Sequence, residues 1–399
     1  MTGRDSTQKH VLFLNWRDTS NPEGGGSEVY VEKIAAELIA RGHRVTIFCA
    51  AHSDAPAYET SPEGIHFLRR GGRHTVYAHA ALSYLAGALG LGRLSVRGVG
   101  RPDILVDVCN GVPFLAPLWS QRPVLALVHH VHRKQWGMVF GRWLARFGWW
   151  IESRLAIRVY RRCRYVTVSE ATRSELAELG VTKERITVVH NGTPLLPAIH
   201  TARTTYPSLI VLGRLVPHKR VEVALQTVAA LAPKLPELRL VVAGQGWWQP
   251  QLRRLAGELG IVNRVDFVGF VTEKEKAALL AAAWLALTPS LQEGWGLTIV
   301  EAGKVGTPTV AFWNAGGVAE AVVDRQTGLL AADTDDYIEK VHALLTDEHA
   351  RRRMGAAARH HAAAFTWVRS GERFAALLAS ATEPRRSRTL LTWCRKPAV

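Results

Sequence analysis

The stretch TPSLQEGWGLTIVEAGKVGTPTVAF, residues 288–312, contains the parts of an α/β sheet in the order in which such sheets are built. An apolar run at 285–289 leads into it, and a second apolar run at 308–312 ends it. Between the runs, Gly294, Trp295 and Gly296 precede a helical pattern that we expect to begin at Leu297. This order of strand, helix and strand predicts parallel strands covered by helices.

The same alternation extends in both directions along the chain. Further apolar, β-branched runs occur at 11–15, 44–49, 104–108, 124–128, 165–169, 186–190, 208–215, 238–243 and 265–268. Each run is typical of a strand that is buried on both faces. The segment 193–207 holds three prolines without a clear period and indicates a linker. We therefore predict two doubly wound domains that face a cleft, at 1–196 and 205–366. Helical patterns follow from 335 onward, including one at about 367–385, and a basic tail occupies 386–399.

The composition and the motifs that are missing limit the classes to which this protein can belong. The chain has 399 residues, 50 lysines and arginines against 34 acidic residues, and a net charge of +16. This excess favours an anionic surface as a partner, although a solvated basic face is the plain alternative. Motifs of nucleic-acid recognition are missing, so nucleic acid is not expected. Four scattered cysteines, the absence of a signal-peptide pattern and the absence of a long apolar segment predict a cytoplasmic protein, either soluble or peripheral at the inner face of a membrane.

A glycine-rich turn follows the first predicted strand. In NPEGGGSE, residues 21–28, Gly25 and Gly26 come just before a helical pattern that starts near Ser27. Glycines at such a turn let a phosphate or a sugar approach backbone N–H groups at a helix N-terminus. A flexible loop is the alternative interpretation. The phosphate-binding motif of P-loop NTPases and the complete dinucleotide fingerprint are both absent, which disfavours those two classes.

Two cations begin the second predicted domain. In LIVLGRLVPHKR, Arg214 follows a strand and Lys219 comes five residues later. At the carboxyl end of a strand, these cations could neutralise a diphosphate leaving group. An exposed basic turn remains the alternative.

Two carboxylates flank the glycine turn in the opening stretch. Glu293 comes just before this turn, and Glu301 lies eight residues later, about one turn into the predicted helix. A carboxylate accepts paired hydrogen bonds and therefore binds sugar hydroxyls well. Two solvated glutamates would leave the glycines and the preceding strand unexplained.

These motifs together resemble the family-4 retaining glycosyltransferases of GT-B fold. The resemblance is carried, in chain order, by GGGSE, a strand that ends at His129, VSEATRSEL, VVHNG, GRLVPHK, VVAGQG, the pair from Glu293 to Glu301, and GGVAEAV with TGLL. It implies two Rossmann-like domains, a nucleotide-sugar donor held mainly by the second domain, and a C-terminal helix that crosses back to the first domain.

The resemblance also implies roles for individual residues. Arg214 and Lys219 would bind the donor diphosphate, and Glu301 would bind the ribose hydroxyls. The donor sugar and phosphates would meet Glu293, the backbone of Gly294, Trp295, Gly296 and Leu297, and the closing glycines Gly25 and Gly26. His129 would lie beside the transferred sugar. In such enzymes the acceptor attacks on the face from which the diphosphate leaves, and no metal or other cofactor is needed. Trp295 stands where phenylalanine is common, and GGVAEAV lacks a frequent proline, so the choice of donor stays open.

The cluster LVHHVHRKQW offers other interpretations. Its histidines could bind a metal, but no carboxylate lies within ten residues on either side, so a metal site is not expected. Histidines without a chemical role are a second alternative. If the strand ends one residue later, His130 takes the position assigned to His129.

Aromatic residues and cations alternate after this cluster. The aromatic residues are Trp136, Trp143, Phe147, Trp149 and Trp150, and the nine cations are Arg133, Lys134, Arg142, Arg146, Arg154, Arg158, Arg161, Arg162 and Arg164. This combination predicts an interfacial amphipathic helix at an anionic membrane. The alternative is a helix packed on the core with extended arginines.

The sequence thus predicts an enzyme that moves a hexose from a UDP- or GDP-sugar to an acceptor hydroxyl with retention of configuration. The acceptor would be a sugar, a small molecule or a lipid-linked compound. Alternatives are a nucleotide-sugar 2-epimerase of similar fold and a noncatalytic sugar-nucleotide or membrane adaptor. The base, the sugar and the acceptor stay open.

Overall fold

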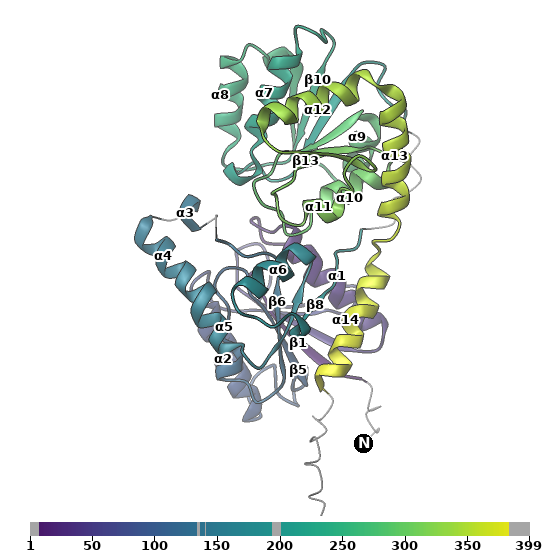
Figure 1. Ribbon diagram of the computed structural model, residues 1–399. Coiled ribbons are helices and arrows are strands. Elements are labelled where there is room, and N and C mark those ends of the chain that lie inside the picture. Colours follow the sequence, from purple (N-terminus) through teal and green to yellow (C-terminus); the bar gives the residue numbers. More distant parts are fainter. Residues whose placement is uncertain (1–7, 134–135, 140, 194–200, 383–399) are drawn as a thin grey trace, which may run out of the picture.

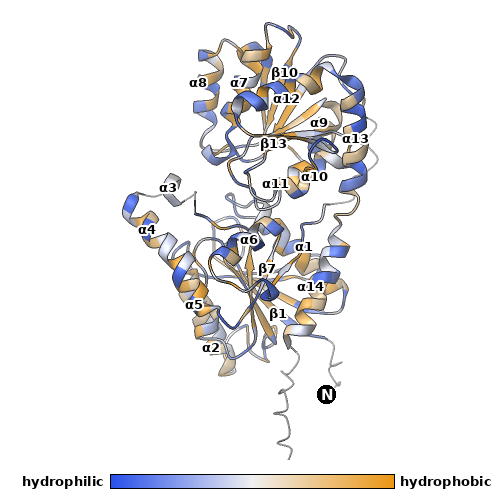
Figure 2. Cartoon of the chain, in the orientation of Figure 1, coloured by the Kyte–Doolittle hydropathy of each residue, from blue (hydrophilic) through white to orange (hydrophobic). Residues whose placement is uncertain are grey.

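A computed structural model describes residues 8–133, 136–139, 141–193 and 201–382. The chain forms two domains, each built on a largely parallel sheet covered by helices, and the C-terminal helices run along one side of both domains (Figure 1). Apolar residues concentrate in the sheets, whereas the helices carry both hydrophilic and apolar residues (Figure 2). The expected pair of doubly wound domains is confirmed.

The first sheet has the strand order β3-β4-β2-β1-β5-β6-β7-β8, and only the pair β3 and β4 is antiparallel. Its strands are β1 (His10–Leu14), β2 (Arg44–Cys49), β3 (Tyr58–Thr60), β4 (His66–Arg69), β5 (Ile104–Val108), β6 (Val124–Val128), β7 (Arg164–Thr167) and β8 (Ile186–Val188). Val11 and Phe13 of β1 face one apolar cluster, and Leu12 and Leu14 face another. This burial on both faces explains why the strand is an unbroken apolar run.

The second sheet has the strand order β11-β10-β9-β12-β13-β14 and is parallel throughout. Its strands are β9 (Ser208–Leu212), β10 (Arg239–Ala243), β11 (Val265–Gly269), β12 (Leu285–Thr288), β13 (Thr309–Phe312) and β14 (Gly328–Ala331). The apolar runs thus predicted eleven of the strands to within a few residues, and β3, β4 and β14 were not predicted. These three are short edge-side strands without a long apolar run.

Helices cover both sheets. Those of the first domain are α1 (Gly26–Ala40), α2 (Val76–Ala88), α3 (Trp136–Val139), α4 (Arg142–Trp150), the π-helical turn Ile151–Ala156, α5 (Ile157–Val159) and α6 (Glu170–Glu178). Those that follow are α7 (Val221–Leu231), α8 (Gln249–Glu258), α9 (Glu273–Ala282), α10 (Leu297–Lys304), α11 (Val318–Ala321), α12 (Thr334–Thr346), α13 (Glu348–Ala362) and α14 (Trp367–Thr382). Short 3₁₀ turns lie at Ala116–Leu118, Lys183–Arg185, Pro217–Lys219 and Val262–Arg264.

Helix α14 returns to the first domain, as the resemblance implied. Its Phe374 ring lies 5.9 Å from the ring of Phe13 in β1, and Ser370 Oγ donates to the carbonyl of His190 at 2.7 Å. A Cβ on Gly371 would lie 2.5 Å from the Cβ of Glu37, so glycine allows α14 to approach α1 closely. The predicted basic tail, and most of the proline-containing half of the linker, lie outside the described residues.

Within the described ranges, no helix combines the length and the apolar character needed to cross a membrane.

Candidate functional site

The glycine turn of the first domain lies directly against the second domain. Gly25 precedes α1, and its N–H group donates to the Glu28 carboxylate at 2.7 Å. A Cβ on Gly25 would lie 3.5 Å from Cζ of Arg214, and a Cβ on Gly26 would lie 3.3 Å from Cδ1 of Leu297. The structure therefore brings together, across the two domains, residues that the sequence separates widely.

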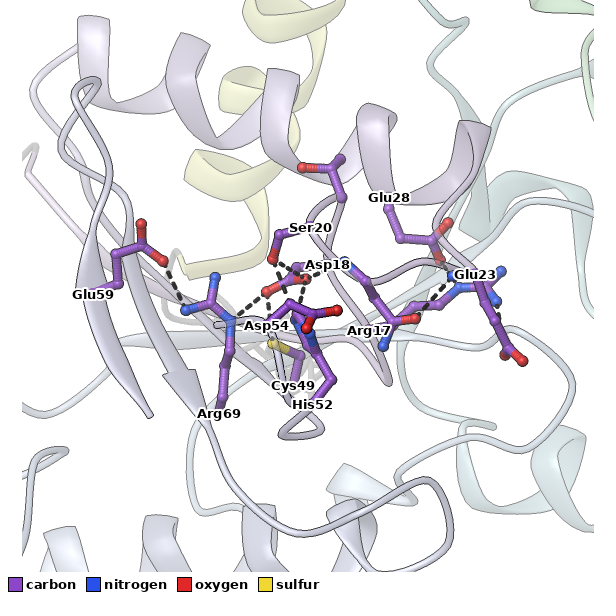
Figure 3. A network of polar contacts seen from close by, with 12 residues as sticks. Arg17, Asp18, Ser20, Glu23, Glu28, Cys49, His52, Asp54, Glu59 and Arg69 are labelled. Carbon is purple, nitrogen blue, oxygen red and sulfur yellow. Dashed lines mark hydrogen bonds and ion pairs between the residues drawn. The ribbon is translucent and has the colours of Figure 1, made fainter. Parts of the chain in front are cut away.

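The segment before these glycines is held by a polar network (Figure 3). Asp18 pairs with Arg69 at 2.5 Å and with His52 at 3.3 Å, and Arg17 pairs with Glu28 at 3.0 Å. Burial raises the pKa of Asp18, but the hydrogen bonds of Arg69 and Ser20 outweigh burial and leave the pKa below its ordinary value. The network fixes the segment that leads from β1 to Gly25. Sequence analysis missed it because its members come from separate elements.

Arg214 follows β9, and its side chain is exposed to solvent, although protein atoms of both domains surround much of it. This surrounding protein and the nearby Arg17 lower the pKa of Arg214, while Glu28 and Glu293 oppose the shift. A guanidinium stays charged at neutral pH despite such a shift. Arg214 is therefore a cation between the domains that has few anionic neighbours in direct contact.

Lys219 and Glu293 form an ion pair at the end of the 3₁₀ turn Pro217–Lys219. Lys219 Nζ lies 2.5 Å from Glu293 Oε1, and Ser290 Oγ donates to the same oxygen at 2.6 Å. Burial raises the pKa of Glu293, but Lys219 and Ser290 outweigh burial and lower the pKa below its ordinary value. The two predicted residues thus meet, and Ser290 is a partner that the sequence did not single out.

Helix α10 begins beside the end of β6. A Cβ on Gly294 would lie 2.6 Å from the carbonyl oxygen of His129, so only glycine permits this approach. Gly296 has a φ of 95° and precedes Leu297, where the helix starts as predicted. The free N–H groups of this N-terminus favour an anionic group.

The Trp295 side chain is buried among other aromatic rings. Its indole is buried and packs against His190, with ring centroids 4.4 Å apart, and against Phe365, at 4.9 Å. Trp295 can therefore contribute to a donor site only through its backbone.

Glu301 lies on the second turn of α10 and is buried. Its Oε1 atom accepts a hydrogen bond from Lys276 Nζ of α9 at 2.7 Å, and Lys276 also contacts Glu273 at 2.8 Å. Burial raises the pKa of Glu301, and Lys276 only partly offsets this. Sequence analysis missed Lys276, which lies in an ordinary charged helix without any motif.

His129 follows β6 and is buried. Its ring meets the Tyr30 ring edge-on at 5.2 Å, and its Nε2 atom has no hydrogen-bond partner among the described residues. Burial lowers the pKa of His129 to about 3, so the ring is neutral at physiological pH. The fallback residue, His130, instead packs against His132, with ring centroids 4.1 Å apart and ring planes tilted by 44°. A buried neutral ring with an unsatisfied nitrogen suits a hydrogen bond to a polar ligand.

Across the described ranges, no three His, Cys, Asp or Glu side chains are grouped so that they could hold a metal ion. His132 of the histidine cluster instead bridges Asn110 and Glu152, at 3.0 Å each.

Comparison with known proteins identifies the family. Residues 24–195 match the profile "Glycosyltransferase Family 4", and residues 193–361 match "Glycosyl transferases group 1". A D-inositol 3-phosphate glycosyltransferase of Stackebrandtia nassauensis is 31% identical over 92% of this chain and 90% of its own length. The chain belongs to the family-4 glycosyltransferases. In this glycosyltransferase, the motifs from GGGSE to TGLL all lie within the two matched segments.

Two further proteins place this glycosyltransferase among its relatives. A GDP-mannose-dependent alpha-(1-6)-phosphatidylinositol monomannoside mannosyltransferase of Mycolicibacterium smegmatis is 27% identical over 92% of this chain and 98% of its own length. The structure of sucrose-phosphate synthase from Thermosynechococcus elongatus superposes with a TM-score of 0.76 at 19% identity, covering 93% of this chain and 98% of that one. The structural likeness shows that the two chains share a fold.

Proposed function

We propose that this glycosyltransferase transfers a hexose from a UDP- or GDP-sugar to an acceptor hydroxyl with retention of configuration and without a metal. The observation that carries the proposal is the approach of Gly25 to Arg214 across the two domains, with Lys219 on the same strand-end segment. A diphosphate in this position would meet the Arg214 guanidinium, the Lys219 ammonium and the N-terminus of α10. The name of the mannosyltransferase relative, which specifies a GDP-sugar, supports this class of donor.

The proposed chemistry follows from charge. The bond between the anomeric carbon and the diphosphate oxygen breaks, and the acceptor oxygen bonds to the same carbon from the same face. The acceptor proton passes to an oxygen of the leaving diphosphate. Arg214 and Lys219 stabilise the negative charge as it develops, because preorganised cations need no rearrangement during the reaction.

The remaining residues would orient the donor. Glu301 would accept hydrogen bonds from ribose hydroxyls, and Glu293 from the sugar. His129 is neutral and buried, so its unsatisfied Nε2 would bond a sugar hydroxyl and would not act as a cation. Donor binding would therefore compete with the ion pairs that Lys219 and Lys276 make with these glutamates.

A ligand screen followed by product analysis tests the proposal. A nucleoside diphosphate at a hundred times its dissociation constant should add about 2.7 kcal/mol to the free energy of unfolding. With a matching donor and an acceptor, we expect an α-linked product from an α-linked donor by NMR, at the same rate with and without EDTA. An inverted product would overturn retention. Conversion of the donor to its 2-epimer without an acceptor would assign an epimerase. Nucleotide binding without any donor turnover or hydrolysis would assign an adaptor.

A further inference from the structure

Helix α4 carries an apolar face that is open to solvent. The face consists of Trp143, Leu144, Phe147 and Trp150, whose exposed fractions are 83%, 63%, 59% and 50%. Residues 143, 147 and 150 recur at helical spacing, so their side chains form one stripe along the helix. In Figure 1, α3 and the beginning of α4 project from the side of the first domain. We call these four side chains the α4 face.

The surroundings of the α4 face are strongly cationic. Exposed arginines lie on this helical segment, at Arg142, Arg146, Arg154 and Arg158, and beyond its end, at Arg161 and Arg162 in the following turn and Arg164 at the start of β7. Glu152 is the only acidic residue between positions 133 and 164. Its carboxylate is mostly buried and accepts hydrogen bonds from His132 at 3.0 Å and from the Trp136 indole at 2.7 Å. The positive charge around the α4 face is therefore not neutralised locally.

The structure also shows that only some aromatic residues of the predicted amphipathic stretch are open to solvent. Trp149 packs partly buried against the core, and the Trp136 ring lies against α4, where a Cβ on Gly148 would come within 2.3 Å of it. These two tryptophans hold the helical segment on the domain and are not available to a membrane. Lys134 lies outside the described residues. The aromatic residues of this stretch that are open to solvent are therefore Trp143, Phe147 and Trp150 of the α4 face.

We propose that the α4 face and its flanking arginines bind the surface of an anionic lipid bilayer. Aromatic and leucine side chains on a convex helix can insert shallowly between head groups, while arginines meet the lipid phosphates. A rigid protein pocket would need to match four protruding side chains, whereas a bilayer adapts to them. Nucleic acid could bind the arginines, but it would leave the exposed apolar side chain of Leu144 without a contact.

The α4 face is connected to the end of β6. Glu152 follows α4 by two residues and is bonded to His132, which lies three residues after His129. The other ring nitrogen of His132 lies 3.0 Å from Asn110 Oδ1, just after β5. A bilayer bound at α4 would thus lie beside the strand ends of the first domain. Resting on the proposed function, this placement assigns a lipid-linked acceptor to the first domain.

Vesicle co-sedimentation of the full chain tests the surface directly. The probes are vesicles of phosphatidylcholine alone and vesicles with added phosphatidylglycerol, at about 0.1 M and about 1 M salt. We expect binding to anionic vesicles at low salt, weak binding at high salt, and little binding to neutral vesicles. Arg142→Glu with Arg146→Glu should weaken anionic-vesicle binding by about tenfold or more. Trp143→Ser with Phe147→Ser should weaken it by about fivefold and leave its salt dependence in place.

Matched controls separate the α4 face from net charge and apolarity in general. Arg254→Glu with Lys274→Glu makes the same charge change on the second domain, and Val262→Ser with Phe270→Ser removes exposed apolar groups there. Both controls should bind vesicles within about twofold of the wild type. Every altered side chain is exposed, and circular dichroism checks that each variant is folded.

Other outcomes overturn the proposal. Equal recovery of the wild type in the supernatant with both kinds of vesicle would rule out the bilayer. If the α4 variants and the matched controls lost vesicle binding equally, the binding would be a nonspecific attraction and not a property of the α4 face. A dimer that Trp143→Ser with Phe147→Ser dissociates, without vesicle binding, would assign the α4 face to a second copy of the chain. Retention by single-stranded RNA but not by vesicles would assign it to nucleic acid. Calorimetry with nucleoside diphosphates tests the proposed function separately, since no α4 variant alters the donor site.

Discussion

A carboxylate oxygen of Glu320, on α11 in the second domain, lies 3.2 Å from Nε2 of His190 in the first domain. The same carboxylate accepts hydrogen bonds from the N–H groups of Glu170 and Ala171, each at 2.9 Å, and so caps the N-terminus of α6. Burial raises the pKa of Glu320, but these hydrogen bonds outweigh burial and lower the pKa below its ordinary value. Glu320 is therefore a polar contact that joins the two domains.

Replacing Glu320 should loosen this contact. We expect Glu320→Ala to lower the free energy of unfolding by about 2 kcal/mol, because it removes a charged acceptor from two N–H groups. The folded-state pKa lies below the unfolded one, so the stabilisation is complete above about pH 5 and is lost as the pH falls through the folded value. Thermal unfolding from neutral to acidic pH checks this. The gap between wild type and variant should close on acidification, and the exposed control Glu339→Ala should show no gap at any pH.

The cation pair should control turnover. Arg214→Ala should lower turnover by about a hundredfold and leave the unfolding free energy nearly unchanged, since the side chain is exposed and forms no ion pair with a carboxylate among the described residues. Steady-state kinetics and thermal unfolding measure both effects. Lys234→Ala, an exposed cation on the same domain, is the matched control. Normal turnover in a folded Arg214→Ala variant would contradict the diphosphate role.

Lys219 should affect both turnover and stability. Lys219→Ala should lower turnover by about a hundredfold, and it should also destabilise the fold by about 2 kcal/mol because it leaves Glu293 without its ammonium partner. Adding Glu293→Gln should recover most of the lost stability but no activity. If the double variant is as active as the wild type, the pair has only a structural role.

The two carboxylates should have separable effects on binding and transfer. Glu301→Ala should weaken the affinity for a nucleoside diphosphate, because the proposed ribose contact is lost. Glu293→Gln should spare that affinity and slow transfer, since its proposed contact is with the sugar. Calorimetry and kinetics on both variants decide this. Lys276→Met is the control for Glu301, because it removes the ion-pair partner and keeps the carboxylate. Unchanged affinity in Glu301→Ala would contradict the ribose assignment.

His129 should influence acid stability. Its folded-state pKa of about 3 lies well below the ordinary value near 6.5, so folding requires the neutral ring. Protonation then favours the unfolded state increasingly as the pH falls from about 6.5 toward 3. We expect His129→Phe to remain folded to a lower pH than the wild type and to lose transfer activity. Circular dichroism against pH measures the midpoint, with the exposed His74→Phe as control. An unchanged midpoint would mean that His129 is hydrated in the native state.

The sequence predicted the elements of this fold better than their contacts. Long apolar runs identify β1 and β12 because both faces of each strand are buried, whereas β3 and β14 are too short to give such a signal. Helix α10 was predicted to start at Leu297 because glycines mark the turn before it.

Contacts between residues that lie far apart along the chain could not be predicted from the sequence. Lys276 precedes Glu301 by 25 positions on a different helix, and Glu320 meets the start of α6 from 150 positions away. Neither contact leaves a local pattern of spacing. The aromatic stretch shows the same limit, because spacing alone does not tell that Trp149 turns inward and Trp143 outward.

The π-helical turn Ile151–Ala156 sets the rotational phase of α4 relative to the domain below it. A π turn holds one more residue than an α-helical turn would. If the same residues formed a regular α-helix instead, everything before them would rotate by about 100°. Trp143 and Phe147 would then leave their outward direction while the core around Tyr160 stayed in place. The π turn thus absorbs one residue and decides which way the aromatic stripe points, and deleting one residue within the turn should leave that direction nearly unchanged.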